Sequence, residues 1–524
     1  MDIIRNFPAI SILACMFSAI ISSVLPKKAG RAVCYTLTVV EIGLSLSTLI
    51  YVYNLGESVV YVMGKFPAPW GNEIRFGVLE CLMALAFSII MLLSLLGGLH
   101  KMKDEISESK EFLYYVLVDL LFSSLLALIY TNDIFTAYVF VEINTISAAG
   151  LIVIRENGRT LEAGVRYMIM SLLGSGLLLS GIMTLYDVTG QLLMSNIKEA
   201  VIELNATGQY QIPLTVSIVL MVTGLCIKSA LFPFHTWLPD AYGYSTASSA
   251  AILSSLVSKG YIFLVIKIFY RVVGISEIRS SHILNVLFVF GLVAMIAGSV
   301  SAIRENDIRR MIAYSSVAQI GYIYMGFGLG GDAGMVASIF HILSHAATKS
   351  MLFISAIGLT DVSRGSRHFK DLTGAGHRNK IAGIGFTVGA LSMVGIPLFS
   401  GFISKLQFMD ASMTVRYAKM FPALAVLGIS TILNAVYFMK TVLRIYIPAE
   451  KMSVNRQQAD FATVTAGGNR IGINGVVEEK DRISFSENKL YGFTIIAFVA
   501  LNVFLGLGSN LVIELIRMGL EMFA

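Results

Sequence analysis

The residues of this sequence that could carry chemistry are ionisable side chains within long apolar runs. They are Glu142, Lys228, Lys259, Lys405, His341, His345 and Lys349. The last three recur at every fourth position, a spacing that stacks them along one face of a helix. A lysine at bilayer depth costs roughly 2.5 to 3.5 kcal/mol, so it is kept where it faces protein or water, usually on an ion path. The seven residues therefore predict a proton relay.

Glu142 and Lys228 form the pair that could start such a relay. Removing a lysine from water favours its neutral amine, whereas a nearby carboxylate favours the charged ammonium. Moving Glu142 towards or away from Lys228 would therefore switch the lysine between holding and releasing its proton. From this pair we expect the proton to pass Lys259, then the histidine-bearing face and finally Lys405, with water completing the path in the membrane plane.

Helix-breaking residues accompany two of these lysines. They are Pro233, five residues after Lys228, and Gly395, Pro397 and Gly401, which precede Lys405. A proline removes a backbone donor and clashes with the preceding turn. Unpaired backbone at membrane depth is tolerated only against protein or water. We therefore expect discontinuous helices at both positions.

The composition excludes a soluble protein. The chain has 524 residues, of which 56% are hydrophobic and 14% charged, against about 25% charged in soluble domains. So few charges could not cover several soluble cores, and the abundant apolar residues exclude disorder. The four cysteines lie in apolar stretches, which excludes a disulfide scaffold. The fold class is an all-α polytopic membrane protein.

A helix needs roughly 20 mostly apolar residues to cross the hydrocarbon core. Fourteen such runs lie near 7–25, 31–54, 76–99, 111–130, 133–153, 164–186, 213–232, 247–273, 282–303, 308–330, 334–360, 380–408, 421–448 and 489–515. The first is too long for a typical secretory signal, and Lys27 and Lys28 follow it rather than precede it. We expect it to remain as a helix.

The distribution of lysine and arginine supports fourteen spans. One set of alternate loops and flanking ends collects 24 of the 39 basic residues, and the other set, with both termini, collects 9. Because cytoplasmic loops are enriched in basic residues, both termini are predicted on the non-cytoplasmic side of an energy-transducing membrane, such as a prokaryotic plasma membrane. The formal charge of +6 then reflects topology, and we expect no nucleic-acid partner.

The two predicted breaks fall in the seventh and twelfth spans, so the interrupted helices run in opposite directions, as an inverted-topology repeat requires. We therefore predict two related five-helix units. The expected division of the chain is 1–110, a three-helix segment; 111–273 and 282–448, the two repeats; 449–488, a polar loop; and 489–524, a C-terminal helix.

Other polar residues near the spans have simpler interpretations. Lys267 and Lys440 lie near span ends, where lysines usually extend to the headgroups. Glu80 is expected at the membrane interface, and Glu41 and Asp119 are expected to pack between helices or to pair with basic neighbours. Residues 191–204 repeat apolar positions at helical spacing and predict a helix along the membrane surface, and 449–488 is expected to be mobile or to contact a partner.

Four segments together resemble a known family. Residues 228–242 contain Lys-Ser-Ala-Leu-Phe-Pro-Phe-His-Thr-Trp-Leu-Pro-Asp-Ala-Tyr, and residues 307–322, 341–349 and 395–405 add further matches in order. They are similar to the signatures of the antiporter-like subunits of respiratory complex I and of Mrp-type cation/proton antiporters. With the fourteen-span plan, the resemblance extends over nearly the whole chain.

The resemblance implies the family's two inverted repeats and a proton route through Glu142, Lys228, Lys259, His345 and Lys405. The matched segments also bring in supporting residues, namely His235, Asp240, Tyr314 and Gln319. It further implies assembly with other integral membrane subunits in a larger complex, with or without a peripheral redox arm. No redox cofactor is expected in this chain, and no catalytic chemistry of its own.

Three branches remain open: the D-type subunit of Mrp antiporters, the related subunits of membrane-bound hydrogenases, and the shortest antiporter-like subunit of complex I. The family often has a histidine after the aspartate at 240, whereas Ala241 and Tyr242 follow here; this favours the first two branches. Whether Na⁺ is exchanged for protons stays open, since a Na⁺ site needs several oxygen ligands that a neighbouring subunit could supply.

Two other classes of function fit the sequence less well. A stand-alone secondary transporter of a small solute would need a substrate pocket at the midplane, and the sequence offers a chain of exchangeable groups instead. A membrane enzyme would keep catalytic residues at an aqueous interface. His341 and His345 could nominally bind a metal, but no third ligand is evident in the sequence, so we expect no metal site.

Overall fold

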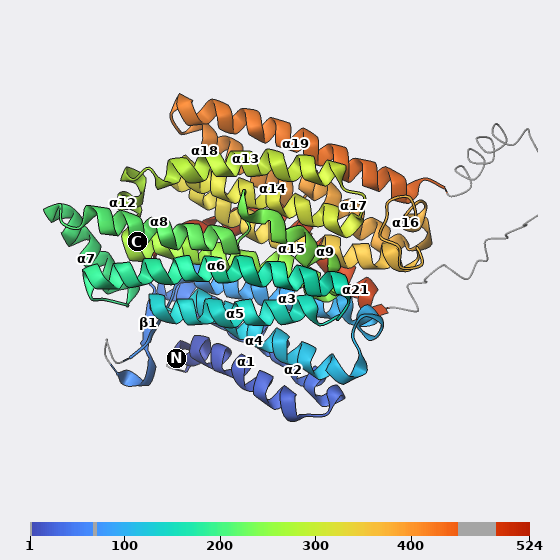
Figure 1. The fold of residues 1–524 in the computed structure, drawn as a ribbon, viewed down its shortest axis with the longest axis horizontal. Coiled ribbons are helices and arrows are strands. Elements are labelled where there is room, and N and C mark those ends of the chain that lie inside the picture. Colours follow the sequence, from blue (N-terminus) through green and yellow to red (C-terminus); the bar gives the residue numbers. More distant parts are fainter. Residues whose placement is uncertain (1–2, 67–70, 449–488, 524) are drawn as a thin grey trace, which may run out of the picture.

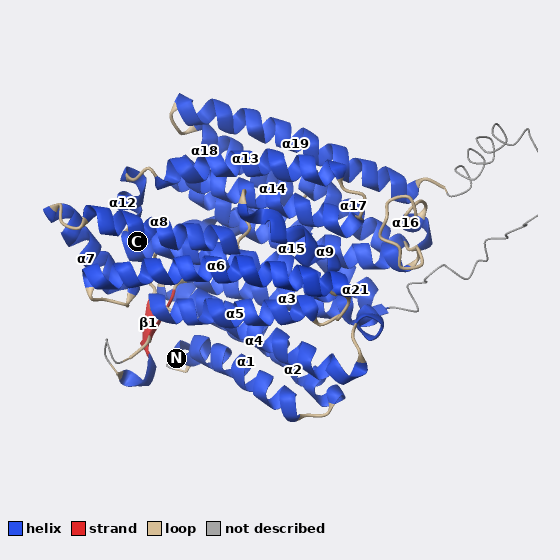
Figure 2. Ribbon diagram, in the orientation of Figure 1, coloured by secondary structure: helices blue, strands red, loops and turns tan. Residues whose placement is uncertain are grey.

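The computed structural model describes residues 3–66, 71–448 and 489–523. Long helices lie side by side along the longest axis (Figure 1), and helix is the main secondary structure (Figure 2). Both chain ends lie at one end of the bundle, whereas α16 (Ala375–Arg378) lies at the other. The predicted all-α fold class is confirmed.

Among the described residues, twelve helices are long and apolar enough to cross a membrane. They are α1 (Phe7–Val24), α2 (Lys27–Leu55), α3 (Val78–Glu105), α4 (Glu111–Tyr130), α5 (Ile134–Val153), α6 (Gly158–Thr189), α8 (Gln211–Lys228), the continuous helix Ala247–Val273, α13 (Ile283–Arg304), α15 (Asp332–Asp361), α19 (Tyr417–Tyr446) and α21 (Lys489–Leu507). The other two expected spans correspond to α14 (Ile308–Leu329), which packs against α13 and α15, and to α17 (Lys380–Val394) with α18 (Ser400–Met413).

Both predicted helix breaks are present. α8 ends at Lys228, and after Pro233 the chain continues through the short helix η4 (Phe234–Trp237) into α9 (Leu238–Tyr244). α17 ends at Val394, and Gly395 follows with a φ of +93°, a left-handed conformation that glycine adopts without strain and that commonly closes helices. The interrupted helices are five spans apart, as the predicted inverted repeats require, and the repeat boundaries themselves stay a prediction.

The helix Ala247–Val273 contains two wide turns that the sequence pattern does not reveal. It comprises α10 (Ala247–Ile252), the π-helical turn η5 (Leu253–Val257), α11 (Ser258–Lys267) and a second π-helical turn, η6 (Ile268–Val273). Lys259 therefore lies directly after a π-helical turn. Such turns are rare and occur frequently at functional sites.

Several smaller elements surround the bundle. The strands β1 (Val59–Val62) and β2 (Glu73–Phe76) form an antiparallel pair between α2 and α3, which the sequence analysis missed. The amphipathic segment 191–204 does contain a helix, α7 (Met194–Thr207); its position along a membrane surface stays a prediction. The chain also forms α12 (Ile275–Ser280) and α22 (Ser509–Glu521). The expected loop 449–488 lies outside the described residues.

The centre of the bundle is formed by α15 and the helix Ala247–Val273. All residues of that helix are buried, and so are residues 334–359 of α15. α15 packs against α3, α14, α17, α18 and α21. Small residues such as Ala346, Ala347 and Ser350 on α15 allow neighbouring helices to approach closely, as is usual inside membrane bundles. Polar groups on these two helices are thereby shielded from lipid.

Candidate functional site

The end of α8 brings Lys228 to Glu142 on α5. The Lys228 side chain is fully buried, that of Glu142 is 26% exposed, and Nζ lies 3.7 Å from Oε1 of the carboxylate. The amine donates a hydrogen bond of 2.7 Å to Thr145 Oγ1. Glu142 also accepts a hydrogen bond from the Ser175 hydroxyl on α6. Glu142 thus has Ser175 as a second partner besides Lys228, and it is the more solvent-accessible member of the ion pair.

A tyrosine connects this pair with the helix that carries Lys259. The Lys228 ammonium lies 5.5 Å from the centre of the Tyr261 ring. The Tyr261 hydroxyl donates to Asn144 Oδ1 at 2.9 Å and lies 3.4 Å from the hydroxyl of Thr145, which accepts from Lys228. Tyr261 stands two positions after Lys259 on α11. The helix that carries Lys259 therefore contributes a side chain to the buried polar cluster around Lys228.

Lys259 lies at the centre of the buried region. Its side chain has no exposed surface, and Nζ donates to the Ser254 carbonyl and, at 3.3 Å, to Ser258 Oγ. Ser254 belongs to the preceding π-helical turn, so the local backbone itself supplies an acceptor. α15 packs against η5, so Lys259 lies beside the helix that carries His345 and Lys349.

The predicted polar face of α15 is formed as the spacing indicates. The His341 and His345 rings stack with centres 5.6 Å apart and planes 10° apart. The Tyr322 ring, on α14, stacks against the other side of His341 at 5.6 Å, and His341 Nδ1 lies 2.6 Å from Ser404 Oγ. Neither ring nitrogen of His345 has a hydrogen-bond partner among the described residues. Since buried polar atoms are normally satisfied, His345 indicates internal water.

The next two amines bind groups on neighbouring helices. Lys349 donates to the Ile312 carbonyl at 2.8 Å and to the Ser315 hydroxyl, both on α14. Lys405, on α18, donates to the Val394 carbonyl at 2.6 Å. The last carbonyls of a helix lack intrahelical partners, so the break after α17 supplies the acceptor that holds Lys405.

Hydroxyl groups line the contact between α15 and the broken helix. Ser344 donates to Ser400 at 2.8 Å, and Ser400 lies 3.4 Å from Ser392. Thr348 lies 3.5 Å from Ser392 and accepts from Asn502 on α21 at 2.7 Å. None of these residues was singled out from the sequence, because isolated hydroxyls in apolar helices are common and only their convergence distinguishes them.

The predicted residues therefore converge without forming one continuous chain. Among the described residues, no hydrogen bond joins Lys228, Lys259, His345 and Lys349 directly to one another. A proton passing along this row needs water between the amines, since donor and acceptor must come within hydrogen-bond distance for transfer.

The four supporting residues lie in different parts of the molecule. The backbone of Gln319 interacts with His341, so Gln319 lies at the relay. His235 stacks on Phe232 beside the break after α8. Asp240 instead forms ion pairs with Arg310 and with Arg166, the latter at 2.9 Å.

The position of Asp240 ties α9 to α6 and α14 at one end of the bundle. Within the described residues, no hydrogen bond or ion pair joins Tyr314 to the relay, so the structure does not group it with the buried amines.

Three charged residues near span ends lie where the sequence analysis did not expect them. Glu80 is completely buried, not interfacial, and forms an ion pair with Arg271, which is 1% exposed. Lys267 does not extend to the headgroups: it is fully buried and donates to the carbonyls of Leu128, Ile129 and Thr131 at the end of α4. The physical reason is that the helix Ala247–Val273 is covered by protein along its whole length.

Arg271 was missed altogether. Its guanidinium lies 4.0 Å from the centre of the Phe523 ring, after α22. The sequence did contain a signal for the position of Glu80, because a glutamate three residues after a helix start commonly caps the helix. In the structure, Glu80 Oε2 accepts a hydrogen bond from the Gly77 backbone N–H at 2.9 Å. Asp119, as expected for a packing group, accepts from Ser18 on α1 at 2.6 Å.

No group of three or more histidine, cysteine, aspartate or glutamate side chains that could hold a metal ion occurs within residues 3–66, 71–448 and 489–523. The candidate site is therefore built from lysine amines, one carboxylate, two imidazoles and hydroxyls. These groups exchange protons and hold water. With water between the amines, the arrangement is suited to proton transfer.

Comparisons with known proteins agree with this geometry. Residues 131–432 match the family model described as the transmembrane part of NADH:quinone oxidoreductase and the Mrp antiporter. The NADH-quinone oxidoreductase subunit N of Desulforudis audaxviator is 32% identical over 395 residues, which cover 75% of this chain and 76% of that protein.

A putative antiporter subunit mnhA2 of Staphylococcus haemolyticus is 31% identical over 368 residues; the match covers 66% of this chain but only 44% of that longer protein. The solved Mrp complex from Dietzia sp. DQ12-45-1b contains a chain that matches with a TM-score of 0.84 at 24% identity, covering 99% of this chain and 97% of that one. The latter likeness shows the fold.

Proposed function

This chain belongs to the family of transmembrane NADH:quinone oxidoreductase and Mrp antiporter subunits, and we propose from that premise that it conducts protons within a larger membrane complex. Protons would pass along the buried row from Glu142 and Lys228, by way of Lys259 and the histidines, to Lys405. The chain is an integral membrane protein, and its own contribution is ion movement.

The observation that carries the proposal is the position of the two outer lysines at the two helix breaks. Lys228 is the last residue of α8, and Lys405 binds the carbonyl that ends α17. Backbone groups freed at membrane depth need protein or water as partners. At each break, unpaired backbone groups therefore lie beside a lysine, Lys228 or Lys405, where water can also bind.

The pair at α8 supplies a switch. In the structure the Glu142 carboxylate lies 3.7 Å from Lys228 and also accepts from Ser175. When the carboxylate is close, the ammonium form of Lys228 is stabilised; when it turns towards Ser175 and the more open side, the buried amine favours its neutral form. The proton released then moves to the next amine through water, and the charge changes at Lys259 act in turn on His345 and Lys349.

Assembly and orientation are part of the proposal. The relatives are named as subunits of an oxidoreductase and an antiporter, so this chain is proposed to work with other integral membrane subunits. The stand-alone solute transporter is not favoured by these relatives. The excess of basic residues on one set of loops supports both termini on the non-cytoplasmic side of a prokaryotic plasma membrane.

The first testable prediction concerns Lys228. A Lys228→Ala variant should lower proton transport by roughly tenfold or more, since positioned proton-transfer groups commonly contribute about 100-fold or more. Transport would be measured in the purified complex, reconstituted into vesicles containing a pH-sensitive dye.

Lys380→Ala is the control, because Lys380 is exposed at the start of α17, away from the row. It should transport as the unmodified complex does. Lys228→Ala complexes that assemble normally and transport at the full rate would contradict the proposed function.

A further inference from the structure

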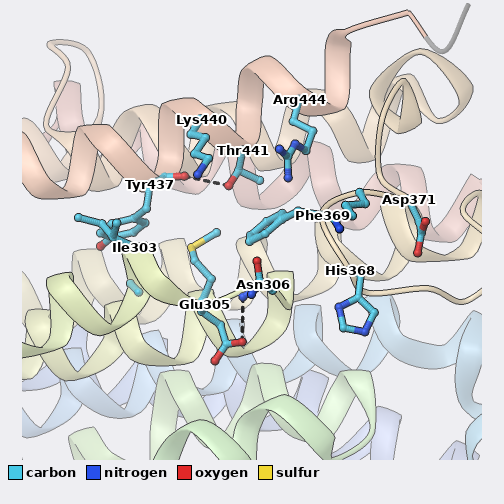
Figure 3. Close-up of a pocket in the computed structure, with 13 residues that line it drawn as sticks. Ile303, Glu305, Asn306, His368, Phe369, Asp371, Tyr437, Lys440, Thr441 and Arg444 are labelled. Carbon is cyan, nitrogen blue, oxygen red and sulfur yellow. Dashed lines mark hydrogen bonds between the residues drawn. The ribbon is translucent and has the colours of Figure 1, made fainter. Parts of the chain in front are cut away.

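A cavity of about 530 Å³ opens at the end of the bundle that carries residues 304–307 and 361–379. Figure 3 shows Lys440, Thr441 and Arg444 of α19 on one side of the cavity and Glu305, Asn306 and Phe369 on the other. It is lined by Ala302, Ile303, Glu305, Asn306, Met311, His368, Phe369, Lys370, Asp371, Tyr437, Lys440, Thr441 and Arg444. Its mixed charges and open end make it accessible to water.

Each of the three helices around this cavity carries a polar residue one turn deeper. On α13, Ser299 stands one turn before the lining residue Ala302, and on α14, Ser315 stands one turn after Met311. Residues three or four apart on a helix lie on the same face. On α19, the lining residue Tyr437 is followed inward by Asn434. All three deeper residues are fully buried.

These deeper residues contact one another. The Tyr437 hydroxyl donates to Asn434 Oδ1 at 2.5 Å, and the Ser299 hydroxyl donates to the same oxygen at 3.4 Å. Ser315 stands one turn inside Met311, which lines the same cavity as Tyr437, and a water beside Tyr437 would link the Tyr437 and Ser315 hydroxyls. Since Ser315 accepts a hydrogen bond from Lys349, one tyrosine and one serine separate the cavity from a buried amine of the row.

A second branch leads from the same column towards Lys405. Ser430 stands one turn beyond Asn434 on α19, and neither its hydroxyl nor that of Tyr322 has a hydrogen-bond partner among the described residues. The Tyr322 ring lies 5.9 Å from the Lys405 amine and stacks on His341. Water between the Ser430 and Tyr322 hydroxyls would extend the column towards a second member of the row.

An unsatisfied amide indicates water in this column. Asn434 Nδ2 is buried and has no hydrogen-bond partner among the described residues. An asparagine amide has two N–H donors, and buried polar atoms without protein partners usually bind ordered water. The amide adjoins the Tyr437 hydroxyl, so a water there would lie between the cavity and Ser315.

We propose that this cavity and the column Tyr437, Asn434 and Ser315 form a hydrated proton-access route to Lys349. The inference rests on the proposed proton relay and adds an aqueous mouth, in the second half of the chain, to that same row. A proton from cavity water is taken up at one end of the column, which water completes, while another is delivered to neutral Lys349. Each hydroxyl gives up one proton and receives another, so none changes its net protonation.

One test removes a single hydroxyl. Tyr437→Phe keeps the ring packing and deletes the link, and it should lower proton transport by about fivefold, since a side-chain hydrogen-bond network loses more than one pairwise contact when broken. The control is Tyr446→Phe on the same helix, whose hydroxyl contacts Thr387 instead. The control should transport as the unmodified complex does, and equal recovery of both assembled complexes excludes misfolding.

A second test addresses the mouth of the cavity directly. The four native cysteines are buried, so a cysteine introduced at Lys440 can be labelled selectively with a charged, membrane-impermeant thiosulfonate. Labelling from the cavity side should lower transport by about fivefold relative to the same unlabelled variant, because it adds bulk and a fixed charge at the entrance. Lys380→Cys, exposed at the same end but outside the cavity, is the control and should be unaffected.

The outcomes separate this inference from the proposed function. An inactive Lys228→Ala complex together with full transport by Tyr437→Phe and by labelled Lys440→Cys would overturn the access route and leave the relay standing. A cavity that only holds a lipid headgroup would also leave Tyr437→Phe at the full rate, which overturns the proposal. Full transport by Lys228→Ala would overturn both.

Discussion

At the scale of single residues, the lysines within the spans differ in the groups that accept their hydrogen bonds. Lys259 and Lys405 each hydrogen-bond a backbone carbonyl near an interrupted or widened helix. Lys267, by contrast, donates to three carbonyls at the end of α4, where a cation also interacts favourably with the helix dipole. Lys267 is thus held as a helix cap, although its side chain is as buried as those of Lys228, Lys259 and Lys349.

A prediction at this scale concerns the Glu80–Arg271 pair. Replacing Glu80 alone by leucine should destabilise the protein by about 3–5 kcal/mol, because it leaves an uncompensated buried charge, whereas the double variant Glu80→Leu/Arg271→Met should recover most of the loss. Thermal unfolding of the purified complex in detergent would measure both.

The exposed pair Arg279–Asp332, with side chains 37% and 77% exposed, is the matched control. Asp332→Asn should change stability by no more than about 1 kcal/mol. Equal small effects of Glu80→Leu and Asp332→Asn would show that the buried pair does not hold α3 to the helix Ala247–Val273.

At the scale of elements, the broken helices depend on close backbone approach. A Cβ built on Gly401 would lie 1.8 Å from the Ser392 carbonyl oxygen. The first turn of α18 therefore rests directly on the end of α17, and Gly401 N–H donates to Ser392 Oγ at 3.2 Å. This contact sets the position from which Lys405 reaches Val394.

Gly401→Ala should accordingly displace the start of α18, lower stability by about 1–3 kcal/mol as overpacked sites commonly do, and reduce proton transport. Gly428→Ala on α19 is the control, since nothing lies within 4 Å of its added Cβ. Thermal unfolding and vesicle transport of the two variants would be compared. A Gly401→Ala complex as stable and active as Gly428→Ala would contradict the close-approach argument.

At the scale of the whole molecule, both termini lie at one end of the bundle and α16, within the basic-rich segment 361–379, lies at the other (Figure 1). An even number of spans produces this arrangement. The polar row crosses the middle of the molecule, whereas the cavity that Lys440 lines opens at the basic-rich end.

A topology prediction follows. Alkaline phosphatase, which is active only outside the bacterial cytoplasm, should be active when fused at either terminus and inactive when fused within 361–379. A cytoplasm-active fluorescent reporter should show the opposite pattern. Activity of the phosphatase at only one terminus would mean an odd number of spans, and inactivity at both would reverse the proposed orientation.

The sequence by itself determined the all-α membrane fold, the two helix breaks and the burial of Lys228, Lys259 and Lys349, because hydropathy, proline and charge act locally along the chain. The functional role of those amines stays a prediction that the transport experiments test. The common face of His341, His345 and Lys349 was also predictable, since it follows from helical spacing alone.

Tertiary structure alone decided which polar residues near span ends are buried. Lipid tails are as apolar as a protein core, so hydropathy cannot distinguish a helix surrounded by lipid from one surrounded by other helices. For that reason Glu80 and Lys267 were placed at the interface, and the column of Tyr437, Asn434 and Ser315 went unrecognised. Only the packing of α13, α14 and α19 brings those three side chains together from distant parts of the chain.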